Sequence, residues 1–253
     1  MSLRSLITGV RSQLAALAQG ALDLLFPPRC VACGRFGSLF CASCLAQVEP
    51  LLPPMCERCG RPTPSGGICS LCRRMPSALD GIRSAAMFEE PLRSAVHHFK
   101  YNNARELAAP LALLLRDCWH RLPLPGDVLL PVPLHERRLR ERGYNQAALL
   151  ARELGQLLDM PVIEEAVQRE RQTLPQVGLS ARERRQNVAG AFHCPDAAMR
   201  GRRVVLIDDV CTTGATLEAC ATALRQDGQA AAVWALTVAR ARRLDDATPP
   251  PTS

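Results

Sequence analysis

Lysine is almost absent from this chain. A membrane-spanning run and a secretory signal are also missing from the sequence pattern, which bears on the class of protein to which the chain belongs. Lys100 is the only lysine among 31 basic residues, so a single arginine reflects compositional habit and is weak evidence for a binding role. No apolar run approaches the length of a membrane-spanning helix. Arg4, Arg11 and several polar residues interrupt the N-terminal stretch, so we expect no secretory signal and a cytoplasmic, reducing location.

The chain of 253 residues is long enough for an α/β core and one small additional module. Its formal net charge is +7. Two zinc ions held by eight thiolates would lower that charge to about +3. The overall charge therefore does not indicate affinity for nucleic acid, and only local clusters of basic residues bear on that question.

Cysteine is the residue in which the chain is rich. Four Cys-x-x-Cys pairs lie within residues 30–72, and two such pairs together supply the four thiolates of a tetrahedral zinc site. We expect two structural Zn²⁺ ions, one held by Cys30, Cys33, Cys41 and Cys44, the other by Cys56, Cys59, Cys69 and Cys72. A crossed pairing of the same cysteines is an open alternative. Because the gaps between the pairs are too short to bury a core, this region needs metal to fold.

Arginines accompany the cysteine pairs, and they have two open interpretations. One is a solvated surface, and the other is contact with DNA. The residues concerned are Arg29, Arg35, Arg58, Arg61, Arg73 and Arg74.

The segment 204–217, VVLIDDVCTTGATL, is where the sequence specifies chemistry most closely. Val204 to Ile207 predict a short strand buried on both faces, which is typical of a parallel sheet. Asp208 and Asp209 follow at its carboxyl end, where open α/β sheets bind ligands. Small and hydroxyl-bearing residues then lead into a helix, a combination that binds anions through backbone N–H groups and the helix dipole. An ordinary capped helix is the alternative, but a cap needs only one residue of this set.

This segment resembles the phosphoribosyl pyrophosphate (PRPP) motif of type I phosphoribosyltransferases. The resemblance implies that Asp208 and Asp209 hold the ribose hydroxyls, with Mg²⁺ nearby, and that the following loop holds the 5′-phosphate. The loop residues are Thr212, Thr213, Gly214, Ala215 and Thr216.

Basic residues follow a second predicted strand, 128–133. Guanidinium groups pair with phosphate oxygens in a bidentate manner, so Arg137 and Arg138 are candidates to bind pyrophosphate. The alternative is a charged face on the helix that continues to Leu158. Lys100 and Arg142 are our candidates to stabilise the departing pyrophosphate during catalysis.

Residues 169–187 are polar and contain few core residues. We hypothesise that Arg169 and Arg171 belong to a flap that closes over bound PRPP.

The remaining patterns complete an α/β domain. We expect a strand over 82–88, helices over 91–101 and 107–119, and a strand over 233–238 that forms a βαβ unit with strand 204–207. The predicted organisation is an amphipathic helix at 1–26, a double zinc ribbon at 27–76, a phosphoribosyltransferase-like domain at 77–240 and a disordered tail at 241–253.

Taken together, these segments resemble the ComF family, also called GntX. The resemblance rests on the cysteine pairs, HFKY at 98–101, PVPLHERRLRERGYNQ at 131–146, RERQT at 169–173 and the PRPP-like segment. It implies a parallel sheet flanked by helices, joined to a double zinc ribbon, with a link to DNA uptake. Two hypotheses follow: a Mg²⁺-dependent phosphoribosyltransferase with an unidentified acceptor, or a non-catalytic protein in which PRPP or a nucleotide regulates binding to single-stranded DNA or a helicase.

Overall fold

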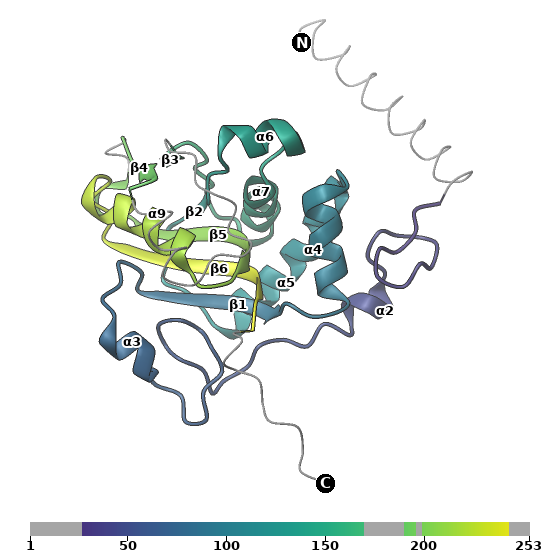
Figure 1. Cartoon of the computed structure of the whole chain (residues 1–253), viewed down its shortest axis with the longest axis horizontal. Helices are drawn as coiled ribbons and strands as arrows, with labels where there is room; N and C mark the ends of the chain where they lie inside the picture. The colour runs from purple at the N-terminus through teal and green to yellow at the C-terminus, as the bar shows by residue number, and fades with distance from the viewer. Residues whose placement is uncertain (1–26, 170–189, 196–198, 243–253) are drawn as a thin grey trace, which may run out of the picture.

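The computed structural model describes residues 27–169, 190–195 and 199–242. Four parallel strands form its central sheet in the order β1 (Gly81–Met87), β6 (Ala232–Arg240), β5 (Arg203–Cys211), β2 (Val128–Pro131). Figure 1 shows this sheet at the centre of the molecule. The strands are rich in Val, Leu and Ala because both faces of the sheet are covered. The predicted α/β class with a parallel sheet is confirmed.

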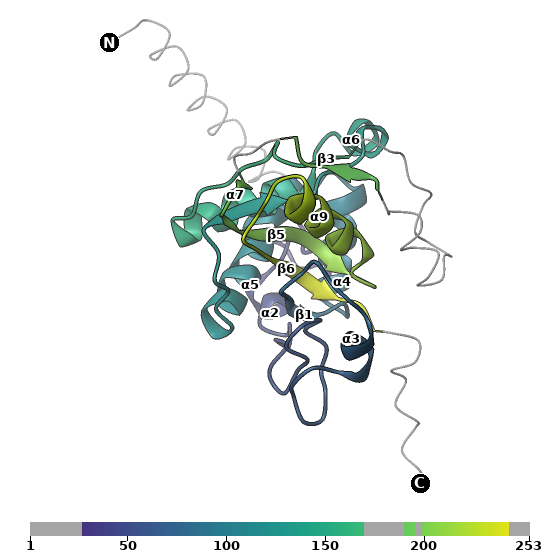
Figure 2. The same cartoon turned by 90° about the vertical axis from the view of Figure 1, so that its left-hand side faces the viewer.

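Helices lie on both faces of the sheet. On one face, α5 (Ala108–Arg121) and α7 (Gln146–Leu158) pack against Val205 and Ile207 of β5. On the other, α9 (Ala215–Gln226) packs against Val204 and Leu206. Figures 1 and 2 show α9 separated from α5 and α7 by the strands. Alternation along β5 thus fills two apolar layers.

Three further helical elements follow the strands β1 and β2. Helix α4 (Leu92–Tyr101) and the 3₁₀ turn η1 (Arg105–Leu107) follow β1, and α6 (Glu136–Arg142) follows β2. A two-stranded hairpin, β3 (Gln168–Arg169) and β4 (Phe192–His193), lies over α9. The expected helix at 1–26, most of the predicted flap including Arg171, and the tail from residue 243 lie outside the described residues.

Strand β5 is longer than the sequence predicted. Its pairing with β2 ends at Pro131 and Ile207, with a last hydrogen bond from Val132 N to Ile207 O at 3.0 Å. Its pairing with β6 continues to Cys211 and Arg240. Asp208 and Asp209 therefore lie inside β5 and not after it, on a stretch whose β2-facing edge has no strand partner among the described residues.

The basic segment after β2 forms the short helix α6, where a loop was one of the two expectations. His135 caps this helix by accepting a hydrogen bond from Arg137 N, and Gly143 ends it with φ of 75°. The helices that follow β2 and β5 reach opposite faces of the sheet. A crevice between the carboxyl ends of these two strands is the position where such sheets bind ligands.

The two cysteine-rich modules repeat one backbone plan. In each, a glycine N–H after the first pair bonds back to the first cysteine carbonyl: Gly34 to Cys30 at 2.8 Å and Gly60 to Cys56 at 2.9 Å. In each, the third cysteine precedes a short helix, α2 (Ala42–Leu45) or α3 (Ser70–Arg74). We call residues 29–45 the first ribbon and residues 55–74 the second ribbon.

The ribbons dock at different places. Cys30, Phe40 and Cys44 of the first ribbon join the apolar cluster that contains α4 and α5. The second ribbon and the segment leading to it cover the free edge of β1, where Leu51 N donates to Ala85 O and Ile82 N donates to Arg58 O. Figure 1 shows α2 and α3 on opposite sides of the molecule. Covering this edge removes a surface on which another strand could add.

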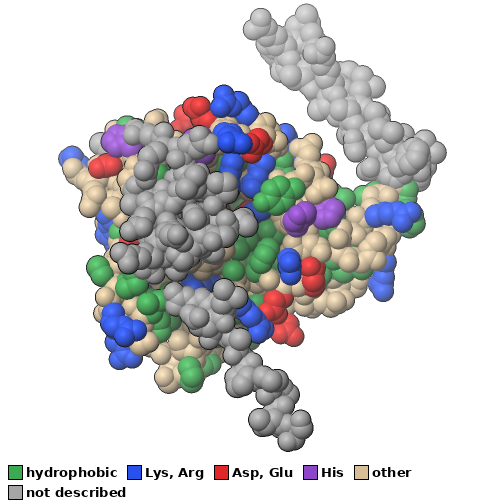
Figure 3. Space-filling model, viewed as in Figure 1, with side chains coloured by type: hydrophobic (Ala, Val, Ile, Leu, Met, Phe, Trp, Pro, Cys, Tyr) green, Lys and Arg blue, Asp and Glu red, His purple; other side chains and the backbone are tan. Residues whose placement is uncertain are grey.

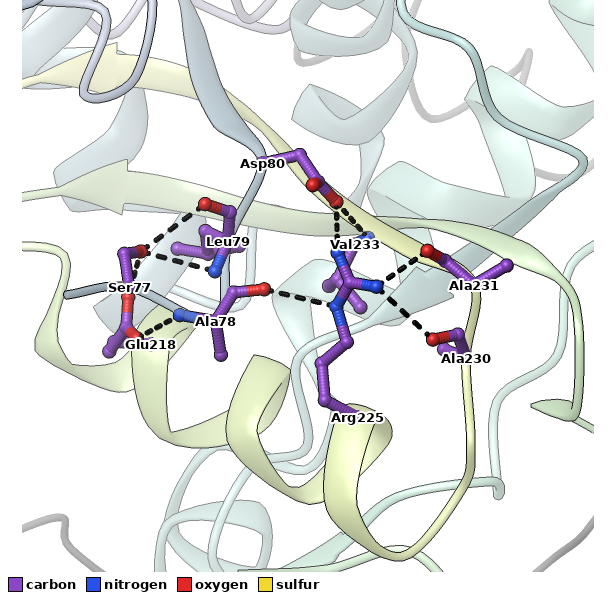
Figure 4. A network of polar contacts seen from close by, with 9 residues as sticks. All are labelled: Ser77, Ala78, Leu79, Asp80, Glu218, Arg225, Ala230, Ala231 and Val233. Atoms are coloured by element: carbon purple, nitrogen blue, oxygen red, sulfur yellow. Dashed lines mark hydrogen bonds and ion pairs between the residues drawn. The ribbon is translucent and has the colours of Figure 1, made fainter.

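A polar network fixes α9 to the segment that leaves the second ribbon (Figure 4). The Glu218 carboxylate accepts from Ser77 Oγ and Ala78 N, both at 2.6 Å. Arg225 donates to Asp80 Oδ2 at 2.6 Å and to Ala231 O at 2.5 Å. Helix α9 is thereby held at both ends of its exposed side, which fixes the loop at its N-terminus.

The equivalent glycines of the two ribbons provide a matched stability test. A Cβ at Gly60 would lie 2.3 Å from the Ile82 carbonyl oxygen, whereas a Cβ at Gly34 meets nothing within 4 Å. Both have positive φ, which costs an alanine about 1 kcal/mol at either position. We expect Gly60→Ala to lose a further 1 to 3 kcal/mol, roughly, through overpacking. Urea unfolding of the zinc-loaded proteins measures this, and equal losses for Gly60→Ala and Gly34→Ala would contradict it.

Candidate functional site

A cavity of about 340 Å³ opens at the carboxyl ends of β2 and β5. Its walls come from the end of α4, the segment after β2, the start of α7, and the loop from β5 to α9. The sequence-predicted residues that line it are Lys100, Arg138, Arg142, Arg169, Asp208, Asp209, Thr212, Gly214, Ala215 and Thr216. The fold therefore brings together residues that are more than 100 positions apart in the chain.

An ion pair lies at the centre of this cavity. Lys100 Nζ is 2.9 Å from Asp209 Oδ1, and the Asp209 side chain is only 8% exposed. Helix α4 brings Lys100 to β5, and the Tyr144 hydroxyl supports it by donating to the carbonyl of the preceding residue, Phe99. The only lysine of the chain thus faces one member of the acid pair.

Asp208 has a perturbed pKa. Burial and the adjacent Asp209 raise the pKa of Asp208 to about 7, although Lys100 and Arg169 act in the opposite direction. Its Oδ1 accepts a hydrogen bond from Asp209 N at 2.9 Å. A cation or hydroxyl donors at this position would favour the ionised form, because two neighbouring carboxylates otherwise repel each other.

Basic side chains surround the same cavity. Arg142 stacks on the Tyr101 ring, with 5.1 Å between its guanidinium carbon and the ring centroid. Arg169 stacks in the same way on Phe192 at 5.3 Å. In the space-filling view, basic and acidic side chains gather at the top of the molecule, over α6 (Figure 3). The positive groups lie on the side of the acid pair where a polyanionic ligand would need them.

The loop between β5 and α9 has the geometry of an anion site. Gly214 takes φ of 82°, and Thr213 Oγ1 accepts from Ala215 N at 3.3 Å. The loop then enters the N-terminus of α9, where the positive end of the helix dipole favours negative charge. The backbone conformation here requires glycine, since a residue with a Cβ resists positive φ.

Some predicted residues do not reach this cavity. Arg137 points to Glu141 on the exposed side of α6, with 2.8 Å between Nε and Oε1. Thr213 faces a second cavity on the other side of the loop, of about 390 Å³, between the second ribbon and α9. Arg171 lies outside the described residues. A helix exposes only part of its side chains to one site, so a run of arginines cannot all contact one ligand.

Gln146 is a site residue that the sequence analysis did not single out. It is 3% exposed and lines the cavity of the acid pair, and its Nε2 has no hydrogen-bond partner among the described residues. A buried amide donor without a partner is costly, so it suits a ligand oxygen at this place. The available signal was its position directly after the Asn145 cap, as the first residue of α7.

The cysteines form two zinc centres, grouped sequentially and not crossed. Within each group of four, all sulfurs lie within 4.8 Å of one another. Cys33 and Cys41 Sγ are 3.6 Å apart, and Cys59 and Cys69 Sγ are 3.9 Å apart. A tetrahedral Zn²⁺ with bonds of about 2.3 Å requires roughly 3.8 Å between sulfurs. The donor sets therefore fit the ion and leave no open position, which makes the centres structural.

The protonation of the thiols follows their surroundings. Burial raises the pKa of Cys72, whereas backbone hydrogen bonds from Cys69, Cys59 and Arg58 lower the pKa of Cys56 to about 6 in spite of burial. Zn²⁺ binds thiolates, so metal binding releases the protons that remain on the group.

The ribbon arginines divide into two sets. Arg58 donates to the carbonyls of Cys72 and Met75, and Arg61 donates to the Thr212 carbonyl at 3.4 Å. Arg29 stacks on Phe36 at 4.1 Å. Arg73 and Arg74, at the end of α3, are exposed. Two of these side chains, Arg58 and Arg61, therefore support the fold, and contact of the others with DNA stays a prediction.

Known proteins share both parts of the chain. Residues 21–73 match the model of the double zinc ribbon domain family. Competence protein F of Haemophilus influenzae is 39% identical over 177 residues, which cover 66% of this chain and 77% of that protein. The chain belongs to the ComF family. The resemblance predicted from the sequence is thereby confirmed.

Further members of the ComF family are also similar to the chain. DNA utilization protein YhgH of Escherichia coli K12 is 37% identical over 175 residues, covering 66% of this chain and 76% of that protein. Competence protein ComFC of Bacillus subtilis is 28% identical over 209 residues, covering 79% and 83%.

Solved structures that are similar to part of the chain are more distant. Glutamine PRPP amidotransferase of B. subtilis is 18% identical with a TM-score of 0.39, and the match covers 55% of this chain and 30% of that one. TT1426 of Thermus thermophilus is 19% identical with a TM-score of 0.33, covering 56% and 86%. Along the described residues, none of the helices combines the length and apolar character that crossing a bilayer needs.

The raised pKa of Asp208 predicts a pH-dependent stability difference. Between its usual value of 3.8 and about 7 the folded chain holds a proton that the unfolded chain releases, so this group lowers the free energy of unfolding as pH rises through that window. Asp208→Asn removes the effect. We expect the free energy of unfolding of Asp208→Asn, measured relative to the wild type in magnesium-free urea unfolding, to increase from about pH 5.5 to about pH 8. The exposed Asp117→Asn serves as the control, and a pH-independent advantage of Asp208→Asn would refute the prediction.

Proposed function

We propose that the crevice between β2 and β5 binds PRPP together with Mg²⁺ and supports phosphoribosyl transfer to a nitrogen nucleophile. One observation carries the proposal: a paired acid dyad, a glycine-containing loop at a helix N-terminus and several cationic side chains face one cavity of about 340 Å³. A volume of this size suits a small, highly charged ligand. Each part of PRPP then has a complementary group. The acid pair faces the ribose diol, the loop faces the 5′-phosphate, and the cationic side chains face the pyrophosphate.

The proposed roles follow from charge. Asp208 and Asp209 accept hydrogen bonds from the ribose hydroxyls, and Thr212, Gly214, Ala215 and Thr216 bind the 5′-phosphate. Lys100, Arg138 and Arg142 face the pyrophosphate, with Arg169 on the side of the predicted flap. Gln146 supplies a further neutral donor to a phosphate oxygen.

Transfer breaks the bond between the anomeric carbon and a pyrophosphate oxygen, and the nitrogen lone pair forms the new bond. Pyrophosphate leaves with the bonding electrons, so fixed positive charge next to it lowers the barrier. Mg²⁺ bound with the pyrophosphate would add to this neutralisation, and the acid pair is the oxygen-donor group suited to the metal–ribose complex. The chain's own contribution is to position the sugar and to stabilise the leaving group.

Calorimetry with PRPP and Mg²⁺ tests the binding site. The double variant Asp208→Asn with Asp209→Asn loses two charge-assisted hydrogen bonds, so we expect its affinity to fall by about 100-fold or more. Asp117→Asn, an exposed carboxylate on α5, is the matched control and should bind as the wild type does. A wild-type chain that does not bind PRPP, or a double variant that binds it unchanged, would exclude the proposal.

A second candidate function is binding of single-stranded DNA by the second ribbon, regulated by the ligand. It is favoured by the exposed, adjacent Arg73 and Arg74 on a module held by metal, and it agrees with the names of the relatives, which refer to competence and DNA utilization. Arginines that contact phosphates make binding salt-dependent.

Fluorescence anisotropy with a single-stranded oligonucleotide tests this candidate. Removing two phosphate contacts by Arg73→Gln and Arg74→Gln should reduce the slope of log affinity against log salt by about 1.4. Arg121→Gln with Arg152→Gln, on α5 and α7, removes the same charge elsewhere and should leave the slope unchanged. Equal slopes for the two double variants would rule out α3 as the DNA contact.

A further inference from the structure

Arg240 is a buried cation without a counter-ion in the described part of the chain. It ends strand β6 and is 2% exposed. Its Nη1 donates to Cys211 Sγ at 3.1 Å, and its Nε is buried with no hydrogen-bond partner. No carboxylate of the described residues pairs with it. Arginine stays protonated in proteins, so this side chain places an uncompensated positive charge in the interior.

The thiol of Cys211 does not provide that compensation. Burial raises the pKa of Cys211, so the thiol is neutral and only a weak acceptor. A charge that is buried and unpaired is strongly unfavourable, and such groups are normally paired with an opposite charge or with a metal centre. The missing negative charge must therefore lie on another neighbour.

The second zinc centre is the candidate for that charge. Arg240, Cys59 and Cys72 line the same cavity between the second ribbon and α9. Zn²⁺ with four thiolates has a net charge of about −2, and hydrogen bonds and charges around the sulfurs are known to set the stability of such centres.

We propose that Arg240 is the positioning residue that balances the charge of the second zinc centre, and that the ribbon anchored in this way positions the loop from Cys211 to Ala215. The first ribbon has the same ligand set but packs on the α4–α5 side of the molecule. The two zinc centres have the same ligands, but the stability of only the second one depends on a side chain of the phosphoribosyltransferase-like part.

One contact joins the second ribbon directly to the loop, and two more hold the strands beside it. Arg240 bonds to Cys211, the first residue of the loop, and Arg61 donates to the carbonyl of Thr212, the next. Gly60 lies so close to β1 that a Cβ would meet the Ile82 carbonyl oxygen at 2.3 Å. The part of the proposal that concerns the loop rests on the proposed function, since it gives the loop a phosphate to bind.

Zinc release to a chelator tests the charge balance, with the two ribbons as mutual controls. Cys33→Ala leaves only the second centre, and Cys59→Ala leaves only the first; zinc analysis should find one ion per full-length chain in each. Adding Arg240→Met should accelerate release roughly 10- to 100-fold in the Cys33→Ala background. It should have no effect in the Cys59→Ala background. Arg152→Met, an exposed arginine of α7, is the substitution control.

Arg240→Lys and Arg240→Gln separate charge from packing, and they keep the test decisive if Arg240→Met does not fold. The lysine variant retains the charge, so it should release zinc more slowly than the glutamine variant. Equal rates for these two would overturn the proposal. Unchanged zinc release from the second centre in the Arg240 variants would also overturn the proposal. Arg240 would then be the partner of an anion in the adjoining cavity.

Calorimetry with PRPP and Mg²⁺ tests the connection to the loop. The Cys59→Ala chain should bind about tenfold more weakly than the Cys33→Ala chain. Equal affinities would refute the connection. If the wild type binds no PRPP, the proposed function fails, whereas zinc release still decides the role of Arg240.

Discussion

The unequal pairing of strand β5 is the constraint on which the rest of this structure depends. On one side its ladder with β2 stops at Ile207, which accepts the last hydrogen bond from Val132 N, and on the other its ladder with β6 continues to Cys211. The stretch from Asp208 onward is therefore held straight by one neighbour and open on the other edge. A ligand reaching this edge meets a rigid backbone, which limits the entropy lost on binding. The crevice, the acid pair and the approach to α9 all follow from this difference in length.

Charge is concentrated where the strands end. Lys100 compensates Asp209, while Asp208 is left with a raised pKa, and Arg240 is buried one strand away with no carboxylate partner among the described residues. Apolar interiors tolerate such groups only when a partner, a metal or a ligand supplies the opposite charge. Under the two proposals made above, a phosphate ligand bound with a cation supplies that charge on one side and a zinc–thiolate centre supplies it on the other. The loop from Cys211 to Ala215 lies between them.

The two ribbons show how similar modules acquire different roles through docking. Their knuckles share the same hydrogen bonds and the same short helices. The second contacts β1 and the candidate phosphate loop, however, and the first contacts the α4–α5 cluster. Membership of the ComF family accounts for the presence of both ribbons. Their contacts with the rest of the chain determine which part of the structure each ribbon supports.

The sequence by itself determined the local chemistry of this protein: the spacing of the cysteine pairs, the buried strand before Asp208 and Asp209, and the glycine-containing loop into α9. These are short-range patterns, in which each residue constrains neighbours only a few positions away. Tertiary structure alone decided that Lys100 reaches Asp209, that Arg137 turns away, that Gln146 faces the crevice and that Arg240 meets the second ribbon. Those contacts depend on how strands and helices that are distant in the chain pack together. Arginines or glycines in similar sequence positions therefore have different environments in the folded structure.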